Sequence, residues 1–292
     1  DQYSVIMAGD GGMEYAMCTF IDGVGHPTMR SLLSVTSHEI AHTWFQFLMA
    51  TNESKHSWMD EGFTSYIDDV AMNVILNEGK ALPNAKAYKD YFRWVATGLE
   101  EPMTTHADRF KFNTGYGMSA YDKGSIFLSQ LQYIIGKENF DDTLKKYFKD
   151  WSFRHPKPND FIRSAERISG LELDWYLLDW AQSTMTIDYS INSVYGVDGK
   201  TKIILKRIGQ MGMPIDIRIV LESGDYLDYN IPMTKMRGSK PLNNSTLLDS
   251  WSWAKPYYEF WIEIDSDDVS KVLIDPKNEM ADIDRINNSL DL

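Results

Sequence analysis

Two histidines and a glutamate lie in one short segment, at a spacing that could bind a metal ion and use it. They are His38, Glu39 and His42, in the pattern H-E-x-x-H. On a helix, residues four apart project from the same face, so both imidazoles can reach one ion. Glu39, one position after His38, can face a water molecule held beside that ion. The pattern therefore favours a zinc site that activates water.

A third ligand is expected from the next helical pattern along the chain. Glu61 opens a periodic run from Phe63 to Leu76, and two antiparallel helices joined by a loop can bring a carboxylate to a histidine pair. His38, His42 and Glu61 would leave one tetrahedral position open for water, which is typical of catalytic zinc sites. We therefore expect one Zn²⁺ per chain.

The expected secondary structure changes along the chain from helices, which carry these residues, to strands. From Ser31 to about Thr184, apolar residues recur every three or four positions, which predicts six or seven helices. After Thr186 the sequence turns to runs rich in β-branched and aromatic residues, at 201–205, 215–221 and 258–264, separated by turn residues such as Asp198-Gly199. We expect an α+β chain: a mostly helical domain, a boundary near 186–190, and a small antiparallel β-sandwich.

Composition excludes several classes of protein. The 292 residues include 43% hydrophobic side chains, enough for a real core, and 29 basic against 42 acidic residues give a net charge of −13. Nucleic acid and anionic membrane surfaces are therefore not expected as partners. Cys18 is the single cysteine, so no intramolecular disulfide or cysteine zinc cluster is possible. No apolar run approaches the length of a membrane span, and no secretory signal pattern assigns a compartment.

Four motifs in order resemble a known family. The segment His-Glu-Ile-Ala-His-Thr-Trp-Phe from His38 is followed by Trp-Met-Asp-Glu-Gly-Phe around Glu61, after Gly-Gly-Met-Glu-Tyr at 11–15 and before Tyr-Asp-Lys-Gly at 121–124. This arrangement is similar to the gluzincin peptidases of the aminopeptidase N and leukotriene hydrolase type. The resemblance implies a thermolysin-like catalytic domain over 1–186 and the family's β-sandwich domain over 187–292.

The resemblance also implies catalytic roles. Glu39 would be the general base that takes a proton from water and delivers it to the leaving amine. Tyr121 would donate its hydroxyl hydrogen to the oxyanion that forms on attack. Tyr116, five residues earlier, matches an active-site tyrosine of some family members.

The upstream motif implies a substrate-binding edge. Glu14 would pair with a free α-ammonium and thereby restrict the enzyme to chain ends. Gly11 and Gly12, which lack side chains, would let the backbone beside Met13 approach the substrate and pair with it as an added strand. Tyr15 stands where the family usually has asparagine.

A carboxylate is also expected behind one zinc histidine. Asp68 follows Glu61 by seven residues and so lies on nearly the same helix face, from which it could accept the spare N–H of an imidazole. Asp60 and Asp69 compete for this role.

The leading hypothesis is therefore a zinc aminopeptidase acting on peptides with a free amino terminus. A related zinc hydrolase, either an endopeptidase or an epoxide hydrolase, is one alternative. A catalytically silent zinc-binding scaffold for a protein partner is another. The family also implies an N-terminal β-domain and a large C-terminal helical domain as partners within a longer parent chain.

Overall fold

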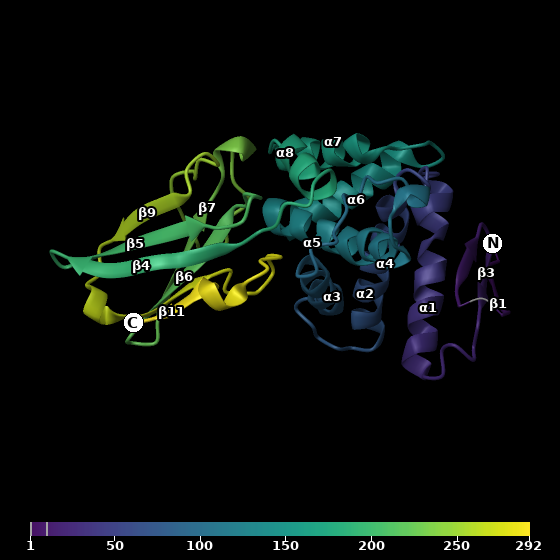
Figure 1. Ribbon diagram of the computed structural model, residues 1–292, viewed down its shortest axis with the longest axis horizontal. Coiled ribbons are helices and arrows are strands. Elements are labelled where there is room, and N and C mark those ends of the chain that lie inside the picture. Colours follow the sequence, from purple (N-terminus) through teal and green to yellow (C-terminus); the bar gives the residue numbers. More distant parts are fainter. Residues whose placement is uncertain (1, 10) are drawn as a thin grey trace. The chain divides into compact units, whose positions relative to one another are not determined.

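The computed structural model describes residues 2–9 and 11–292 and combines helices with sheets (Figure 1). The chain forms two compact units, each assembled from more than one stretch of sequence. The first contains Asp1–Ser129, Asp141–Ser164 and Trp180–Thr184; the second contains Gln130–Phe140, Ala165–Asp179 and Met185–Leu292.

The first unit opens with a small sheet that the sequence patterns did not predict. Its strands are β1 (Ser4–Met7), β2 (Met13–Tyr15) and β3 (Cys18–Ile21), in the order β1-β3-β2. β3 pairs in parallel with β1 and antiparallel with β2, which leaves β2 at an edge. Helix α1 (Met29–Ala41) lies between this sheet and helix α2 (Phe63–Ile75) (Figure 1).

The predicted helical region is confirmed as helical. Its remaining helices are α3 (Ala85–Val95), α4 (Asn113–Gly117), α5 (Lys123–Ile135), α6 (Lys137–Trp151), α7 (Pro158–Ser169) and α8 (Asp174–Tyr176). A buried aromatic cluster holds the first unit together: the ring centroids of Trp58 and Phe127 are 4.8 Å apart, as are those of Phe63 and Phe161. These four side chains are at most 1% exposed, so they fix the start of α2 against α5 and α7.

Among the described residues of the first unit, three complete π-helical segments border longer helices: η1 (Thr43–Leu48), η2 (Trp58–Gly62) and η4 (Met118–Asp122), and a further one, η5 (Leu177–Ala181), is shared with the second unit. Each of the three leads into or out of a longer helix, since η1 follows α1, η2 precedes α2 and η4 precedes α5. A π-helical turn holds one more residue than an α-helical turn, and such segments concentrate at functional sites.

The second unit contains two sheets. Strands β4 (Tyr189–Val197), β5 (Lys200–Arg207) and β9 (Tyr257–Ile262) form an antiparallel sheet in the order β4-β5-β9. The other sheet has the order β11-β10-β6-β7-β8 and pairs antiparallel, except that β8 runs parallel to β7. Its strands are β6 (Ile215–Leu221), β7 (Tyr226–Ile231), β8 (Thr246–Leu247), β10 (Val269–Ile274) and β11 (Ser289–Asp291).

The alternation of buried and partly exposed side chains explains why the sequence pattern predicted these strands. In β6 the side chains of Ile215, Ile217 and Ile219 are completely buried, while the residues between them are partly exposed. The predicted run 215–221 coincides with this strand. Between β4 and β5, Asp198 and Gly199 both have positive φ, +50° and +74°, as a two-residue hairpin turn requires.

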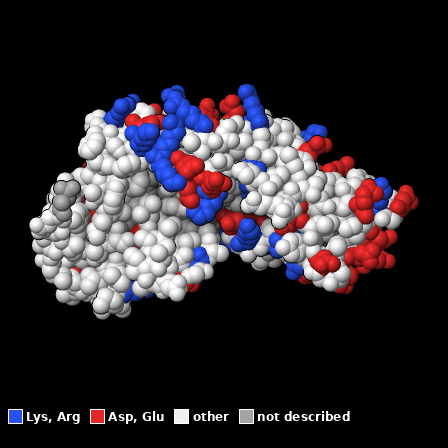
Figure 2. All heavy atoms as spheres, turned by 180° about the vertical axis from the view of Figure 1, so that it is seen from behind, with Lys and Arg blue, Asp and Glu red and all other residues white. Residues whose placement is uncertain are grey.

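In the view of Figure 2, no face of the surface is uniformly basic. Figure 2 shows lysine and arginine side chains lying beside acidic ones instead of gathering into a uniform patch. Among the described residues, no helix has the length and apolar character needed to cross a membrane.

Candidate active site

Helix α1 supplies two imidazoles from one face. The helix begins with a capping box, in which the Thr28 and Ser31 side chains each accept from the other's backbone N–H. Its last turn carries His38, and His42 caps its end. The Nε2 atoms of the two histidines face each other at 3.2 Å.

The segment after α1 fixes the orientation of His42. The helix kinks within η1 at Phe45, whose carbonyl oxygen lies 2.8 Å from His42 Nδ1. A proton on Nδ1 donates to this carbonyl, which leaves the Nε2 lone pair free to bind a metal ion. The kink therefore selects the tautomer of His42 that a metal site needs.

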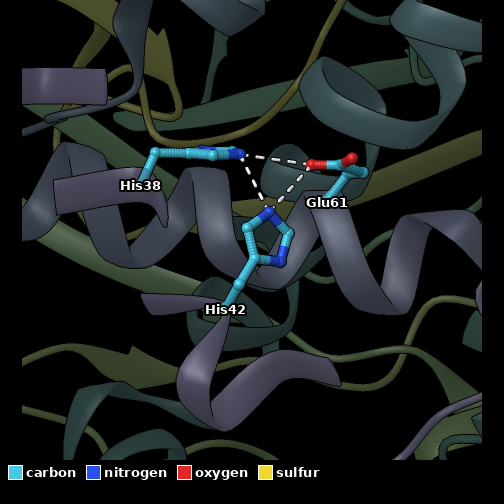
Figure 3. A group of neighbouring side chains, drawn as sticks. All are labelled: His38, His42 and Glu61. Carbon is cyan, nitrogen blue, oxygen red and sulfur yellow. Dashed lines mark hydrogen bonds and ion pairs between the residues drawn. The ribbon is translucent and has the colours of Figure 1, made fainter. Parts of the chain in front are cut away.

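Glu61 completes a group of three ligands. It lies in η2, and its Oε2 atom is 3.2 Å from His38 Nε2 and 3.3 Å from His42 Nε2 (Figure 3). Three donor atoms placed tetrahedrally about 2.0–2.1 Å from a zinc ion would be about 3.3–3.4 Å apart. The observed triangle fits this ion without rearrangement, and two imidazoles with one carboxylate are a donor set that zinc prefers.

The charge of Glu61 suits a ligand. Burial alone would raise the pKa of its carboxyl, but the contacts with His38 and His42 lower that pKa to about 2. Glu61 is therefore an anion at neutral pH, in the form that coordinates a cation.

The carboxylate behind the histidine pair belongs to Asp60. Its Oδ1 atom lies 2.8 Å from His42 Nδ1, and the side chain is buried. Asp68, the residue favoured from helix spacing, instead accepts a hydrogen bond from the Ser34 hydroxyl at 2.8 Å. Ser34 lies one helical turn before His38 on α1. Asp68 of α2 therefore contacts α1 one turn away from the zinc histidine that it was expected to contact. Asp69 lines a neighbouring cavity together with Asp68.

Glu39 faces the cavity beside the three ligands. Its side chain is 5% exposed, and its Oε2 atom has no hydrogen-bond partner among the described residues. Burial raises the pKa of its carboxyl, against the opposing effect of His38 and His42. A carboxylate with a raised pKa and a free oxygen is equipped to accept a proton near neutral pH.

Tyr121 reaches the site from η4. Its hydroxyl donates to Glu61 Oε1 at 2.6 Å, and its ring stacks on His38 with a centroid distance of 5.9 Å. Burial and the nearby Glu61 carboxylate raise the pKa of the phenol, so it stays protonated and remains a donor. Tyr116 lines the same cavity.

Two further residues of the Tyr121 motif, Lys123 and Gly124, have structural roles. Lys123 is buried, and its Nζ atom lies 2.5 Å from the carboxylate of Glu100, whose side chain is 7% exposed. Gly124 is in backbone contact with Gly62, the residue after the Glu61 ligand. The two residues that follow Asp122 thus anchor the start of α5, and η4 with it, against the segment that carries Glu61.

Gly11 and Gly12 differ in how closely other atoms surround them. A Cβ atom on Gly12 would collide with the Glu39 carboxylate and would lie 2.9 Å from Val35. A Cβ on Gly11 would meet no atom within 4 Å, so only Gly12 is constrained by packing. Met13 and Glu14 follow in the edge strand β2, beside the catalytic cavity.

One cavity of about 330 Å³ collects most of the expected residues. Gly11 does not line it, and Asp68 lines the neighbouring cavity instead. Sequence reasoning missed Glu53, Ser54 and Ala107, which belong to loops or short turns without any periodic signal. The expected residues at the cavity are Gly12, Met13, Glu14, His38, Glu39, His42, Glu61, Tyr116 and Tyr121.

Comparison with known proteins agrees with this geometry. The peptidase family M1 domain matches residues 16–180, more than half of the chain. The chain therefore belongs to peptidase family M1, which confirms the resemblance inferred from its motifs.

Individual relatives are longer than this chain. Human aminopeptidase B is 30% identical over 188 residues, which cover 57% of this chain and 29% of that protein. Aminopeptidase M1 of Arabidopsis thaliana is 24% identical over 231 residues, covering 76% of this chain and 24% of that protein. The matched part of this chain thus spans 24% to 29% of the lengths of these relatives.

A solved structure shares the fold. The crystal structure of Legionella pneumophila aminopeptidase A in complex with aspartic acid aligns with a TM-score of 0.60 at 17% identity. The alignment covers 93% of this chain and 30% of that one. At this identity, the likeness concerns the mixed helix-and-sheet fold alone.

Proposed function

We propose that the chain is the catalytic part of a zinc-dependent aminopeptidase, which hydrolyses the first peptide bond of peptides with a free amino terminus. The observation that carries the proposal is the triangle of His38, His42 and Glu61 donor atoms, 3.2–3.3 Å on each side, with Glu39 and Glu14 facing the same cavity. Membership of peptidase family M1 and the similarity to aminopeptidase B and aminopeptidase M1 support it.

His38, His42 and Glu61 would hold one ion per chain. When bound, zinc supplies Lewis acidity for the scissile carbonyl and lowers the pKa of a water molecule towards about 7. The protein's part is to hold the Nδ1 proton of His42 against the Phe45 carbonyl and Asp60, so that Nε2 faces the ion, and to keep the Glu61 carboxylate ionised.

Glu39 and Tyr121 would handle the proton and the developing charge. Glu39, through its free Oε2 atom, would take the proton of the attacking water and pass it to the departing amine. Tyr121, whose hydroxyl now donates to Glu61, would donate to the oxyanion of the tetrahedral intermediate.

Glu14 and the edge strand β2 would select chain ends. A carboxylate on the wall of the cavity pairs with an α-ammonium and leaves no room for upstream residues. Among the strands of the described residues, β2 pairs with β3 alone, and its other edge would hydrogen-bond with an extended substrate.

We also propose a thermolysin-like catalytic domain over 1–186 and a β-sandwich domain over 187–292. The change from helices to strands at Tyr189 and the likeness to the Legionella pneumophila structure support this division. Further domains of a longer parent chain stay a prediction.

The test is hydrolysis of a panel of aminoacyl chromogenic amides, with and without a chelator, and after zinc is added back. Activity should require zinc, at about one ion per chain, and N-acetylated amides should be poor substrates. His42→Ala should lose the metal. Unchanged zinc content in that variant, or equal cleavage of acetylated and free amides by the unmutated protein, would contradict the proposal.

A further inference from the structure

A buried ion pair lies directly beside the segment that carries Tyr121. The side chains of Lys123 and Glu100 are 2% and 7% exposed, and Lys123 Nζ donates to Glu100 Oε1 at 2.5 Å. The same Nζ atom also donates to the carbonyl oxygen of Ser183 at 3.3 Å and lies 5.6 Å from the ring centroid of Trp180. All of these residues belong to the first unit. The proposed hydrolysis uses neither Lys123 nor Glu100, and neither side chain lines the catalytic cavity.

Stability alone does not explain this pair. Removing two charges from water costs about as much free energy as their attraction returns, so apolar side chains of similar volume often serve a protein core equally well. A buried pair does supply a defined geometry, because each charge has to face the other to be compensated. Lys123 and Glu100 therefore hold the backbone segments that carry them at a fixed distance.

The same loop also holds the chain on the other side of Tyr121. The hydroxyl of Ser119, a buried residue, donates to the carbonyl oxygen of Glu101 at 3.4 Å. Ser119 precedes Tyr121 by two residues and Lys123 follows it by two, and their partners are adjacent residues of the loop after α3. Tyr121 is thus held from both sides by Glu100 and Glu101.

The segment between these two contacts has a backbone that needs such support. η4 is π-helical, and π-helical turns are rare compared with α-helical ones, so the contacts around η4 have to favour this form. If the same residues formed an α-helical turn, Tyr121 would move around the axis by about 100° relative to α5. Its hydroxyl would then lose the 2.6 Å hydrogen bond to Glu61 Oε1.

We propose that Lys123 is a positioning residue for hydrolysis: its buried bond to Glu100 holds η4 in the form that directs the Tyr121 hydroxyl at the bound substrate. The proposal rests on the aminopeptidase function given above. Lys123 itself touches no substrate, so its loss should leave KM nearly unchanged. The oxyanion that Tyr121 stabilises forms only during the reaction, so the loss should appear in kcat and only while the Tyr121 hydroxyl is present.

The kinetic test uses a charge-free variant that combines Glu100→Leu with Lys123→Met, which removes both charges and leaves no lone charge buried. With leucyl p-nitroanilide, kcat should fall about 10-fold and KM should change by less than about twofold, because part of a contact worth about 10²–10³-fold is lost. In the Tyr121→Phe protein, the same two substitutions should change kcat by less than about twofold. An equal loss with and without the hydroxyl would overturn the proposal.

Glu100→Asp carries the same test if the charge-free variant does not fold. It keeps both charges and shortens the carboxylate side chain by one methylene group, so the pair can close only if the backbone moves. It should lower kcat about threefold with Tyr121 present and leave kcat unchanged in the Tyr121→Phe protein. Equal kcat values for Glu100→Asp and the unmutated protein would contradict the proposal.

Lys146→Met with Asp150→Asn is the matched control. This pair also lies in the first unit, at 2.8 Å on α6, but its side chains are 29% and 34% exposed and line no part of the catalytic cavity. Its removal should change kcat by less than about twofold. A loss as large as that of the charge-free variant would mean that any missing ion pair has this effect, which would also overturn the proposal.

An NMR experiment separates this proposal from the proposed function, because it requires no hydrolysis. In zinc-loaded protein with ¹³C-labelled tyrosine rings, the signal that Tyr121→Phe lacks belongs to Tyr121. In the charge-free variant this signal should shift or broaden, because the ring changes its place beside His38 and Glu61. The control pair should leave it in place. A Tyr121 signal that is the same in the charge-free variant and in the unmutated protein would overturn the proposal, even if no aminoacyl amide is cleaved.

Discussion

Gly62 and Gly124 are in direct backbone contact. A Cβ atom on Gly62 would lie 2.6 Å from the Gly124 Cα, and one on Gly124 would lie 2.8 Å from the Gly62 Cα. Gly62 follows the Glu61 ligand, and Gly124 lies three residues after Tyr121, so this contact determines how closely the two segments of the site approach. The hydrogen bond from Tyr121 to Glu61 depends on that approach.

Gly124→Ala should therefore lower both stability and turnover. Alanine is intrinsically better than glycine in a helix by about 1 kcal/mol, but the added methyl meets backbone, and overpacking of this kind costs about 1–3 kcal/mol or more. Thermal unfolding and hydrolysis rates measure the two effects. Gly117→Ala is the control, because a Cβ there meets no atom within 4 Å. A Gly124→Ala protein as stable and active as Gly117→Ala would show that the contact is not needed.

Glu39→Gln should keep zinc and lose activity. The amide preserves the size of the side chain and removes the proton acceptor, so hydrolysis should fall by about 10²–10⁴-fold. Metal analysis and single-turnover rates measure the two quantities. Turnover within a few-fold of the unmutated protein would end the general-base assignment.

Tyr121→Phe should separate a catalytic hydroxyl from a packing ring. The ring that stacks on His38 remains, so the zinc content should not change, and the unfolding temperature should fall only by the effect of one lost hydrogen bond to Glu61. Turnover should fall by about 10²–10³-fold, the scale of one lost oxyanion donor. Normal turnover with a much lower unfolding temperature would make Tyr121 a core residue.

Stability should also depend on pH through a carboxyl group of the second unit. Asp282 is completely buried, and burial raises its pKa to about 7 although its oxygens accept from the backbone N–H groups of Tyr189 and Asp284. The unfolded value is about 3.9, so between about pH 4 and about pH 7 the folded chain binds a proton that the unfolded chain releases. The free energy of unfolding should fall as pH rises through this window.

Urea unfolding at a series of pH values measures this slope. At about 1.4 kcal/mol for each unit of pKa shift, the change reaches a few kcal/mol. Asp282→Asn cannot ionise, so its stability should vary less with pH across the same window. An identical slope in the variant would place the titrating group elsewhere.

The sequence predicts best where the signal is local. The four-residue spacing of His38 and His42 and the alternating isoleucines of β6 each depend only on helical or strand geometry, and both are confirmed in the fold. Strands β1 to β3 have only three or four residues, too few for a periodic signal, and the pairing of β1 with β3 joins residues fourteen positions apart.

The carboxylates were harder to place for related reasons. Counting α-helical turns from Glu61 favoured Asp68, but η2 inserts a π-helical turn before α2, and the adjacent Asp60 comes to lie beside His42. Glu53 sits in a loop, where no periodicity assigns a direction to a side chain. Its neighbours at the cavity come from β2 and η2, and only the tertiary fold brings them together.

The π-helical turn that carries Glu61 should not tolerate insertion or deletion of a residue. Removing one residue between Trp58 and Gly62 would convert the segment to an α-helical turn and rotate every later position by about 100° around the axis. Glu61 would then no longer face the histidines, or Gly62 would no longer meet Gly124. The spacing within the second motif is therefore fixed by the contacts of both residues.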